Sequence, residues 1–375
     1  MECRTVISAR DFRKNHNQLT SYQSRAKHNE RLCTVYGIEN SFTTVDPAYS
    51  NEFANFASGL LLLQPNQWEG LTVTVSDNIR RWLDEPVPSS SYKLFVPLNT
   101  MVQSLTLKFI FLTLYQDTLD AKDAAVIELA DAINCTWVAA KRGCNVPAFK
   151  DNHYLQKALA PIFPNVDPAD ERGNPLNRIL PGFETIWRVV LRLVLEIGFH
   201  HDTNSLLWKT TLINFAQKPT RTQFMAAGNS FLVSAEHLVN EALRLYPPKR
   251  RIYRSFQEDD SSETTTYGAD VEGCHLDTKI WGSDAFVFNP IRWKGLTTAQ
   301  DAAFIPFGTS PFLCPAQASF GPRAIGLLAG LIFRELKSEW ILNQGSDGVK
   351  VPLLKGRLSN EGNAYSDLFL VKDKD

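Results

Sequence analysis

A long, almost entirely apolar segment in the middle of the chain constrains the fold more than any other feature. From about Asn177 to Phe199 nearly every position is apolar, which predicts a helix in the centre of the structure. Pro181-Gly182 near its start should open the helical hydrogen-bond ladder locally. Glu184 and Thr185 follow directly, so an acid and an alcohol lie side by side in apolar surroundings.

The remaining apolar spacings predict a mainly helical protein with a small β part and no internal repeat. Residues 1 to about 45 are polar and predict irregular structure with short helices, whereas later segments show helical or strand patterns. We predict helices over about 47–83, 97–115, 121–141, 203–216 and 229–245, strands at Arg251–Phe256 and Ala285–Phe288, and a polar loop over Asp259–Thr266.

Composition restricts the class of protein. A chain of 375 residues that is 44% hydrophobic can bury a large core, and we interpret residues 1–375 as a single domain. The formal net charge of -1 argues against nucleic acid as a partner, because phosphate binding needs a basic field. Six scattered cysteines without a CxxC pair indicate neither a disulfide framework nor a zinc site. We expect a soluble chain, because no apolar stretch is long enough for a signal peptide or a membrane span.

One cysteine lies in an unusual setting. Cys314 ends the run Phe304–Cys314, which turns at Gly308 and is broken by prolines, so it predicts an ordered loop. Residues 316–336 carry the apolar stripe of a buried helix. Cys314 is therefore predicted at a helix start, where the dipole favours a thiolate that can bind a metal. An isolated cysteine is more usually a small buried hydrophobe, so the surrounding motifs decide between the two interpretations.

Two further motifs precede the cysteine. Glu241 and Arg244 are three residues apart, which on a helix places them on one face within reach of an ion pair. Apolar neighbours suggest that this pair is buried, and a buried pair needs further hydrogen bonds to offset desolvation. Arg292, in the run Phe288–Trp293, is a candidate third member.

In this order, the motifs resemble those of the cytochrome P450 family. The match consists of Glu241-xx-Arg244, Phe288-x-Pro290-x-Arg292-Trp293, and a Phe307-Gly308 loop that ends in Cys314. The resemblance implies a P450-like fold that holds haem b, with Cys314 as the axial iron ligand and Phe307 beside the cofactor. It also implies that Glu241, Arg244 and Arg292 form a buried triad that supports the haem pocket. A thiolate ligand favours O–O cleavage. Residues 150–375, the haem-binding core, match better than residues 1–150.

The central helix adds a second resemblance. Pro181-Gly182-Phe183-Glu184-Thr185 is similar to the family's Ala/Gly-Gly-x-acid-Thr element, which crosses the distal face of the haem. The similarity implies that Thr185 and Glu184 deliver the protons that heterolytic O–O cleavage requires.

Several positions depart from the family pattern. Ser310 and Ala316 stand in place of glycines, and Phe312 stands where an Arg or His usually pairs with a haem propionate. The nearest equivalent of the family's Trp-xxx-Arg propionate contact is Tyr49-xxx-Phe53, which lacks both residue types. Two cationic propionate partners are therefore missing from the sequence pattern.

Basic residues after the Glu241 helix offer compensation. We expect Arg251 or Arg254 to bind a propionate, as an arginine on this strand often does in the family. Lys249 and Arg250 have two interpretations, a solvated basic corner or a docking patch for an acidic reductase. The segment before the central helix is short for the family, so we expect an incomplete N-terminal sheet and no membrane anchor.

The resemblance implies a monooxygenase that inserts one oxygen atom into a small apolar molecule with electrons from an NADPH-dependent reductase. The motifs Leu245–Pro248 and Trp281–Ala285 are most similar to fungal members, which suggests secondary metabolism and a place in the cytoplasm or at the periphery of the endoplasmic reticulum. Two alternatives remain open: a haem enzyme that catalyses a rearrangement or dehydration, and a haem-free relative that binds a small molecule.

Overall fold

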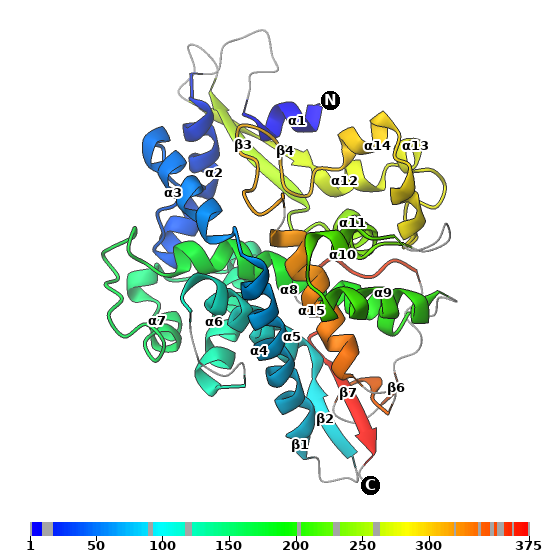
Figure 1. Cartoon of the computed structure of the whole chain (residues 1–375). Helices are drawn as coiled ribbons and strands as arrows, with labels where there is room; N and C mark the ends of the chain where they lie inside the picture. The colour runs from blue at the N-terminus through cyan, green and yellow to red at the C-terminus, as the bar shows by residue number, and fades with distance from the viewer. Residues whose placement is uncertain are drawn as a thin grey trace.

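The computed structural model describes residues 2–9, 18–88, 93–116, 122–200, 204–227, 233–257, 263–318, 320–336, 339–345, 349–350, 356–361 and 364–373. Helices dominate this part of the chain (Figure 1). They are α1 Glu2–Ile7, α2 Ser21–Tyr36, α3 Pro47–Leu60, α4 Pro65–Asp84, α5 Leu98–Leu114, α6 Ala124–Lys141, α7 His153–Leu159, α8 Leu176–Gly198, α9 Ser205–Gln217, α10 Arg221–Met225, α11 Ala235–Leu245, α12 Val271–Leu276, α13 Thr278–Trp281, α14 Thr298–Ala303 and α15 Phe320–Glu335, with 3-10 turns η1 Phe149–Asp151 and η2 Pro290–Lys294.

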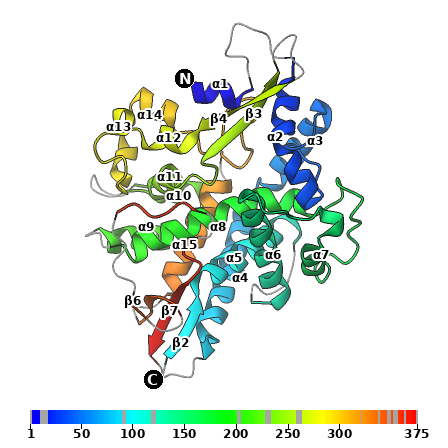
Figure 2. The same ribbon diagram turned by 180° about the vertical axis from the view of Figure 1, so that it is seen from behind.

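The strands form two antiparallel sheets. They are β1 Val87–Pro88, β2 Lys93–Pro97, β3 Arg251–Gln257, β4 Thr264–Asp270, β5 Ile341–Gln344, β6 Val349–Lys350 and β7 Leu368–Asp373. The larger sheet has the order β1-β2-β7-β5-β6, and β3 pairs with β4 in a separate hairpin. The two sheets lie at opposite ends of the molecule, with the helices between them (Figure 2). The mainly helical fold with a small β part is as the sequence predicts.

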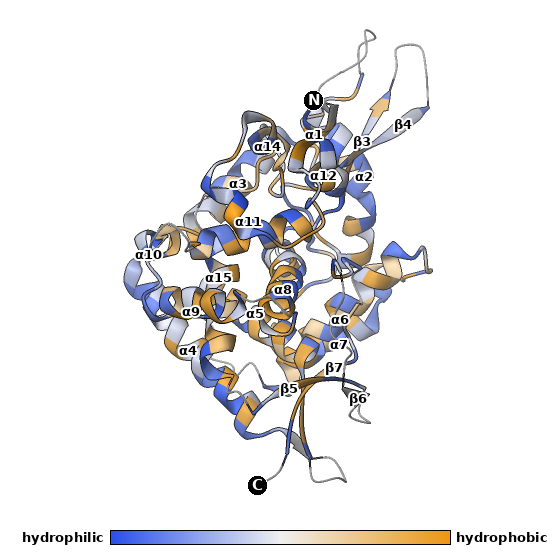
Figure 3. Cartoon of the chain, turned by 90° about the vertical axis from the view of Figure 1, so that its right-hand side faces the viewer, coloured by the Kyte–Doolittle hydropathy of each residue, from blue (hydrophilic) through white to orange (hydrophobic). Residues whose placement is uncertain are grey.

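Helix α8 lies at the centre, where its apolar composition predicts it. It packs against both α5 and α15. Figure 3 shows α8 surrounded by other helices, with apolar residues gathered around it. Phe183, Trp187 and Leu191 have no accessible surface. The helix therefore serves as the scaffold on which both halves of the chain pack.

The chain stays helical through Pro181, which lies inside α8. Proline has no N–H group, so the carbonyl of Asn177 loses its partner four residues later. The side-chain amide of Asn40 donates to that carbonyl at 3.4 Å. A residue between α2 and α3 thus supplies a hydrogen bond that the sequence of α8 removes.

Three local predictions are wrong. Residues 21–36, in a segment expected to be irregular with short helices, form the 16-residue helix α2, which begins with a capping box between Thr20 and Gln23. Ala285–Phe288 forms turns instead of a strand, because the carbonyls of Ala285 and Val287 accept hydrogen bonds from Arg244 at 2.7 and 3.3 Å. The polar loop expected over Asp259–Thr266 ends before Thr264.

That loop loses Thr264–Thr266 to strand β4, where β-branched threonines fit the pleated surface. Strand β3 agrees with the prediction, and its register with β4 runs from Arg251 opposite Asp270 to Gln257 opposite Thr264. Helices α1 and α2 pack on this hairpin (Figure 1). In the part of the chain with described coordinates, no helix combines the length and the apolar character that crossing a membrane requires.

A close helix contact gives a stability prediction. A Cβ atom at Gly330 of α15 would lie 2.3 Å from the carbonyl oxygen of Leu212 in α9. We therefore expect Gly330→Ala to force the two helices apart and to lower the free energy of unfolding by about 1–3 kcal/mol or more.

Gly70→Ala in α4 is the matched control. Its Cβ would meet nothing within 4 Å, so alanine should raise stability by about 0.5–1 kcal/mol through its helix propensity. Urea denaturation followed by circular dichroism measures both variants. Equal midpoints for the two would show that α9 and α15 are not in the described contact.

Candidate functional site

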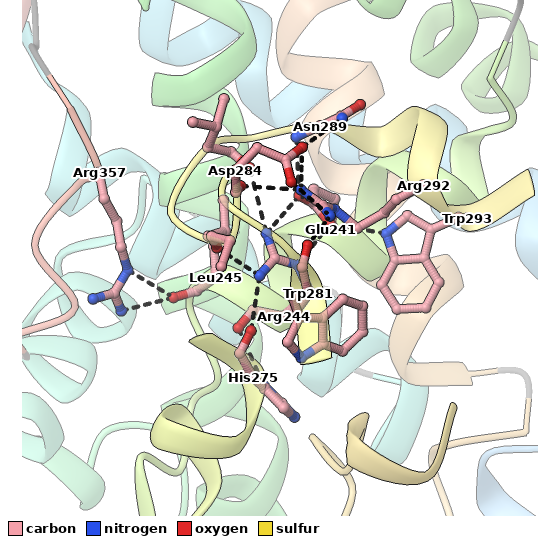
Figure 4. A network of polar contacts seen from close by, with 12 residues as sticks. Glu241, Arg244, Leu245, His275, Trp281, Asp284, Asn289, Arg292, Trp293 and Arg357 are labelled. Atoms are coloured by element: carbon pink, nitrogen blue, oxygen red, sulfur yellow. Dashed lines mark hydrogen bonds and ion pairs between the residues drawn. The ribbon is translucent and has the colours of Figure 1, made fainter. Parts of the chain in front are cut away.

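The site is built on a buried carboxylate at the end of α11. Glu241 and Arg244 have fully buried side chains and form a bidentate ion pair with distances of 2.8 and 2.9 Å. Glu241 also accepts hydrogen bonds from Arg292 at 3.1 Å, from the Asn289 amide at 2.9 Å and from Trp293 Nε1 at 2.9 Å (Figure 4). The structure thus brings together the three residues that the motifs predicted as a triad.

The two arginines fix the backbone around this carboxylate. Arg244 donates to the carbonyl oxygens of His275 and Ala285 at 2.8 and 2.7 Å. Arg292 bonds the Asp284 carboxylate at 3.0 Å and the Asp284 carbonyl at 3.1 Å. Each guanidinium therefore satisfies several acceptors in a turn-rich segment, which offsets the cost of burying its charge.

His275 connects this network to the cysteine loop, a role that the sequence analysis missed. Its Nε2 accepts a hydrogen bond from the Ile305 amide at 3.0 Å, so its Nδ1 donates to the Arg244 carbonyl at 3.1 Å. Burial lowers the pKa of His275 to about 3. The ring is neutral at physiological pH and acts as a fixed spacer between α11 and the loop.

The cysteine loop is closed by its own backbone. The Cys314 amide donates to the Phe307 carbonyl at 3.0 Å, and the Phe312 amide donates to the Thr309 carbonyl at 2.9 Å. Gly308 turns the chain with a φ of 75°, a conformation that favours glycine. Phe307 packs half-buried against the core, close to the first turn of α15. The loop is ordered without helix or strand pairing, as its prolines predict.

Two expectations about Cys314 need correction. Helix α15 begins at Phe320, so the cysteine lies ahead of the helix and not in its first turn. Burial raises the pKa of the Cys314 thiol, although a hydrogen bond from the Ala316 backbone opposes this shift. The Cys314 side chain is half-buried. A bound cation, more than the helix dipole, is therefore needed to favour the thiolate.

Phe312 lies between two arginines. The guanidinium carbon of Arg25 in α2 is 3.9 Å from the ring centroid, and that of Arg254 in β3 is 5.3 Å away. Tyr22 packs edge-on to the same ring with 5.4 Å between centroids. An aromatic ring thus occupies the position where the family pattern has a cation, and cations from two other elements surround it.

Arg25 and Arg254 are buried without an acidic partner in the described part of the chain. Arg25 donates to Ser50 at 3.0 Å and leaves its Nε unbonded, and Arg254 bonds two backbone carbonyls at 2.7 and 3.1 Å. Burial lowers the pKa of Arg25 to about 10. Burial and the nearby Arg25 lower the pKa of Arg254 to about 9. Two buried cations without counterions fit a ligand that carries two carboxylates.

Arg251 and Tyr49, the other residues considered for a propionate contact, do not lie beside Phe312. Arg251 is exposed on the hairpin. Tyr49 donates to the Glu39 carbonyl at 2.9 Å and packs beneath Arg172, away from the loop. Arg25 escaped the sequence analysis because its segment was interpreted as irregular. The small residues Ser24 and Ala26 on either side of Arg25 are the signal in the sequence that could have indicated close packing there.

Helix α8 presents one partly accessible stripe. Between residues 176 and 197, accessible surface remains at Arg178, Pro181, Gly182 and Thr185, which share a face at helical spacing. Thr185 Oγ1 donates to the Pro181 carbonyl at 2.7 Å. Glu184 lies on the neighbouring face, where it pairs with Arg188 at 2.7 Å.

Comparisons with known proteins give a consistent picture. No protein-family model matches the chain. Cytochrome P450 CYP749A22 of Panax ginseng is 31% identical over 36% of this chain and 26% of that protein. Probable cytochrome P450 525A1 of Dictyostelium discoideum is 26% identical over 59% of this chain and 39% of its own length. A cytokinin hydroxylase of Arabidopsis thaliana is 32% identical over 35% of this chain and 30% of its own length. The chain thus spans well under half of these relatives.

A solved structure shows the fold. A six-coordinated cytochrome P450 from Thermus thermophilus superposes with a TM-score of 0.54 at 15% identity, over 88% of this chain and 83% of that one. The chain has a cytochrome P450 fold. Cytochromes P450 hold haem through a cysteine thiolate. A P450 haem also carries two propionates, which the buried cations Arg25 and Arg254 suit. The residues present therefore fit the cofactor.

His275 gives a pH prediction for this P450 fold. With a folded pKa of about 3 and an ordinary value of 6.5, the native state cannot take up the proton that the unfolded chain binds below pH 6.5. Its contribution to stability is therefore complete above that pH and falls by about 1.4 kcal/mol per pH unit as the pH drops towards 3.

The His275→Gln variant should show a shallower loss of unfolding free energy than the wild type between about pH 6.5 and 4.5, measured by urea denaturation at several pH values. Should the variant not fold, the histidine NMR signals of the wild type serve instead. Protonation of His275 in the folded protein above about pH 5 would contradict the prediction.

Proposed function

We propose that the chain acts as a haem-thiolate monooxygenase, which inserts one oxygen atom into an apolar small molecule with electrons from an NADPH-dependent reductase. The observation that supports it most directly is the pair of buried, unpaired arginines beside the cysteine loop. Arg25 and Arg254 are each 5% exposed and share Phe312 as a neighbour. Isolated buried cations are costly, so a protein keeps them where a ligand brings the opposite charge.

In this proposal each residue around the loop has a defined task. Cys314 would hold the haem iron, and Phe307 would pack beside the cofactor. Arg25 and Arg254 would bind the propionates. Glu241, Arg244 and Arg292 would keep the proximal segment rigid through their buried network. When bound, the haem supplies the oxygen activation that protein side chains cannot provide.

The stripe on α8 would form the distal side. Thr185 Oγ1 lies on that stripe and donates its hydrogen to the Pro181 carbonyl, which leaves its lone pairs to accept a hydrogen bond from a neighbouring water. To relay a proton, the hydroxyl would turn from the carbonyl towards the next acceptor as it takes up a proton from the water. Glu184 keeps one oxygen, Oε1, without a hydrogen-bond partner among the described residues. We propose that this oxygen accepts a proton from a water and passes it on, while the ion pair with Arg188 holds the carboxylate in place.

The proposal includes a fungal type of enzyme in secondary metabolism, in the cytoplasm or at the periphery of the endoplasmic reticulum. The motifs Leu245–Pro248 and Trp281–Ala285 support the fungal type. Retention of Glu184 and Thr185 favours oxygen insertion over a rearrangement or dehydration at the haem. The haem-free alternative had two supports, the missing propionate partners and the short N-terminal region. Arg25 and Arg254 would supply the missing cations, which weakens the first of these supports.

The reduced carbon monoxide complex tests the proposed iron ligand. We expect dithionite-reduced protein under carbon monoxide to show the strongly red-shifted Soret band of a thiolate-bound haem. Cys314→Ala should abolish this band, whereas Cys135→Ala, an exposed cysteine on α6, should keep it. A red-shifted band in the Cys314→Ala variant would refute the ligand assignment. Absence of any Soret band after expression with ample haem would support the haem-free alternative.

Haem retention tests the two arginines. Each charge-assisted hydrogen bond to a propionate is worth about 1.5–3 kcal/mol, so Arg25→Ala or Arg254→Ala should weaken haem binding by about 10- to 100-fold. Transfer of haem to excess apomyoglobin measures the loss. Arg251→Ala on the same strand is the control, because its side chain is exposed. Equal transfer rates for Arg254→Ala and Arg251→Ala would exclude a propionate role for Arg254.

A further inference from the structure

Two cysteines that are distant in the sequence meet where α1 lies close to α12. Cys274 Sγ donates a hydrogen bond to Cys3 Sγ across 3.1 Å, although the two residues are 271 positions apart. Their spacing therefore gave no sign of this contact. Both are free thiols and half-buried, so part of each residue is accessible to solvent. Figure 1 shows α1 and α12 at the same end of the molecule.

The surrounding structure keeps the two sulfur atoms together. Helix α1 packs on the β3–β4 hairpin, and β4 leads directly into α12. Cys274 is held from the other side, because Trp281 Nε1 donates to its carbonyl at 2.9 Å. A disulfide bond is about 2.05 Å long, so the sulfur atoms need to approach by about 1 Å to form one. Cys3 also packs against a small buried apolar core, which consists of Val6, Ile7, Ala269, Val271 and Ile305.

The hydrogen bond makes the two thiols chemically different. It lowers the pKa of Cys3 to about 7, against the opposing effects of burial and Asp270, and it raises the pKa of Cys274 above its ordinary value. A large share of Cys3 is therefore thiolate near neutral pH, and the thiolate is the form that attacks a disulfide. Cys274 stays protonated beside it. The pair thus offers an attacking thiol and a second thiol that can resolve a mixed disulfide.

We propose that Cys3 and Cys274 form a reversible disulfide, with a small disulfide such as glutathione disulfide as the oxidant, and that this bond holds α1 on the loop that ends in Cys314. The Cys3 thiolate attacks one glutathione sulfur, the S–S bond of glutathione disulfide breaks, and the departing thiolate takes up the proton that Cys3 has lost. Cys274 then attacks the Cys3 sulfur of the mixed disulfide and releases the second glutathione, which receives the Cys274 proton. Two cysteines are oxidised, and one glutathione disulfide is reduced to two thiols.

Helix α1 touches the cysteine loop directly. Arg4 Nε donates to the carbonyl of Ala302 at 2.9 Å, just before the loop begins. A Cβ atom at Gly308 would lie 3.8 Å from Ile7 Cγ2, so Ile7 lies against the turn of the loop. The Ile7 carbonyl also accepts a hydrogen bond from Arg254 at 3.1 Å. The position of α1 therefore affects both the loop and the arginine that is proposed to bind a propionate.

Helix α12 holds the same loop from the opposite side. His275, which follows Cys274 directly, accepts a hydrogen bond from the Ile305 amide at 3.0 Å. Ile305 also belongs to the apolar core that packs against α1. A bond from Cys3 to Cys274 would connect these two contacts covalently. Openings of the loop that require α1 to move away should then become rarer. The bond itself does not require haem, so the inference goes beyond the proposed function.

Peptide mapping tests the bond. The purified full chain is incubated near neutral pH with glutathione disulfide, its remaining thiols are blocked with N-ethylmaleimide, and it is digested without reductant. We expect a peptide that joins Cys3 to Cys274, two hydrogens lighter than the separate peptides and lost after treatment with dithiothreitol. The Cys135→Ser variant, which changes an exposed cysteine on α6, should still form it. Absence of the joined peptide from the wild type would overturn the inference.

The single variants test the two roles. In Cys274→Ser the serine hydroxyl can still donate to Cys3, so glutathione should attach to Cys3 and stay there. In Cys3→Ser the thiol of Cys274 should remain mostly unmodified, because it lacks the ionised form that attacks. Attachment of glutathione to Cys274 in preference to Cys3 would contradict the assigned roles. A peptide that joins Cys314 to either cysteine would contradict the assigned pair.

Hydrogen exchange followed by mass spectrometry tests the effect on the loop. In the oxidised wild type, peptides that cover residues 304–314 should exchange about 3-fold or more slowly than in the reduced protein. Peptides from α9 should not change. Neither Cys3→Ser nor Cys274→Ser should show the slower exchange after treatment with glutathione disulfide. A joined peptide without slower exchange would refute the hold of α1 on the loop.

The carbon monoxide spectrum, recorded on the same samples, separates this inference from the proposed function. A normal thiolate-haem spectrum without the joined peptide overturns the inference and leaves the proposed function in place. A joined peptide with slower exchange, in protein that shows no Soret band, supports the inference and counts against the proposed function.

Discussion

The arrangement around the cysteine depends on the burial of one carboxylate, that of Glu241. Removing an ionised group from water costs several kcal/mol, and attraction to a single partner does not offset it. Glu241 therefore collects donors from α11, from the turn before η2 and from η2 itself. Arg244 extends the network to the carbonyl of His275, whose ring holds the amide of Ile305. These contacts fix the position of the loop that ends in Cys314.

The interior is also notable for positive charge that the protein does not neutralise itself. Arg25 and Arg254 are buried close enough for one to lower the pKa of the other. Like charges at such sites oppose folding. Ligands that carry carboxylates would relieve this repulsion, so binding and stability should be coupled in the proposed enzyme.

The sequence predicted those parts of the site whose structure depends on residues close together in the chain. The apolar run of α8, the spacing of Glu241 and Arg244 and the prolines before Cys314 each encode their own structure within a few residues. Contacts between distant segments were missed, because no local pattern reveals them. Arg25 reaches the loop from a helix in a segment that was interpreted as irregular, and His275 is joined to Ile305 only through the tertiary fold. Lys249 is exposed, as its basic neighbours in the sequence suggest, but its contact with the Trp137 ring joins segments that are far apart in the sequence.

The hydrogen bond from Asn40 to the Asn177 carbonyl limits which substitutions the N-terminal part of the chain can accept. The N-terminal third matches the family pattern poorly, yet it completes the backbone of α8 two turns before Thr185. Exposed positions in that third can change without disturbing the central helix. A substitution at Asn40 leaves a carbonyl of that helix without its donor, so this position is constrained by a segment far along the sequence.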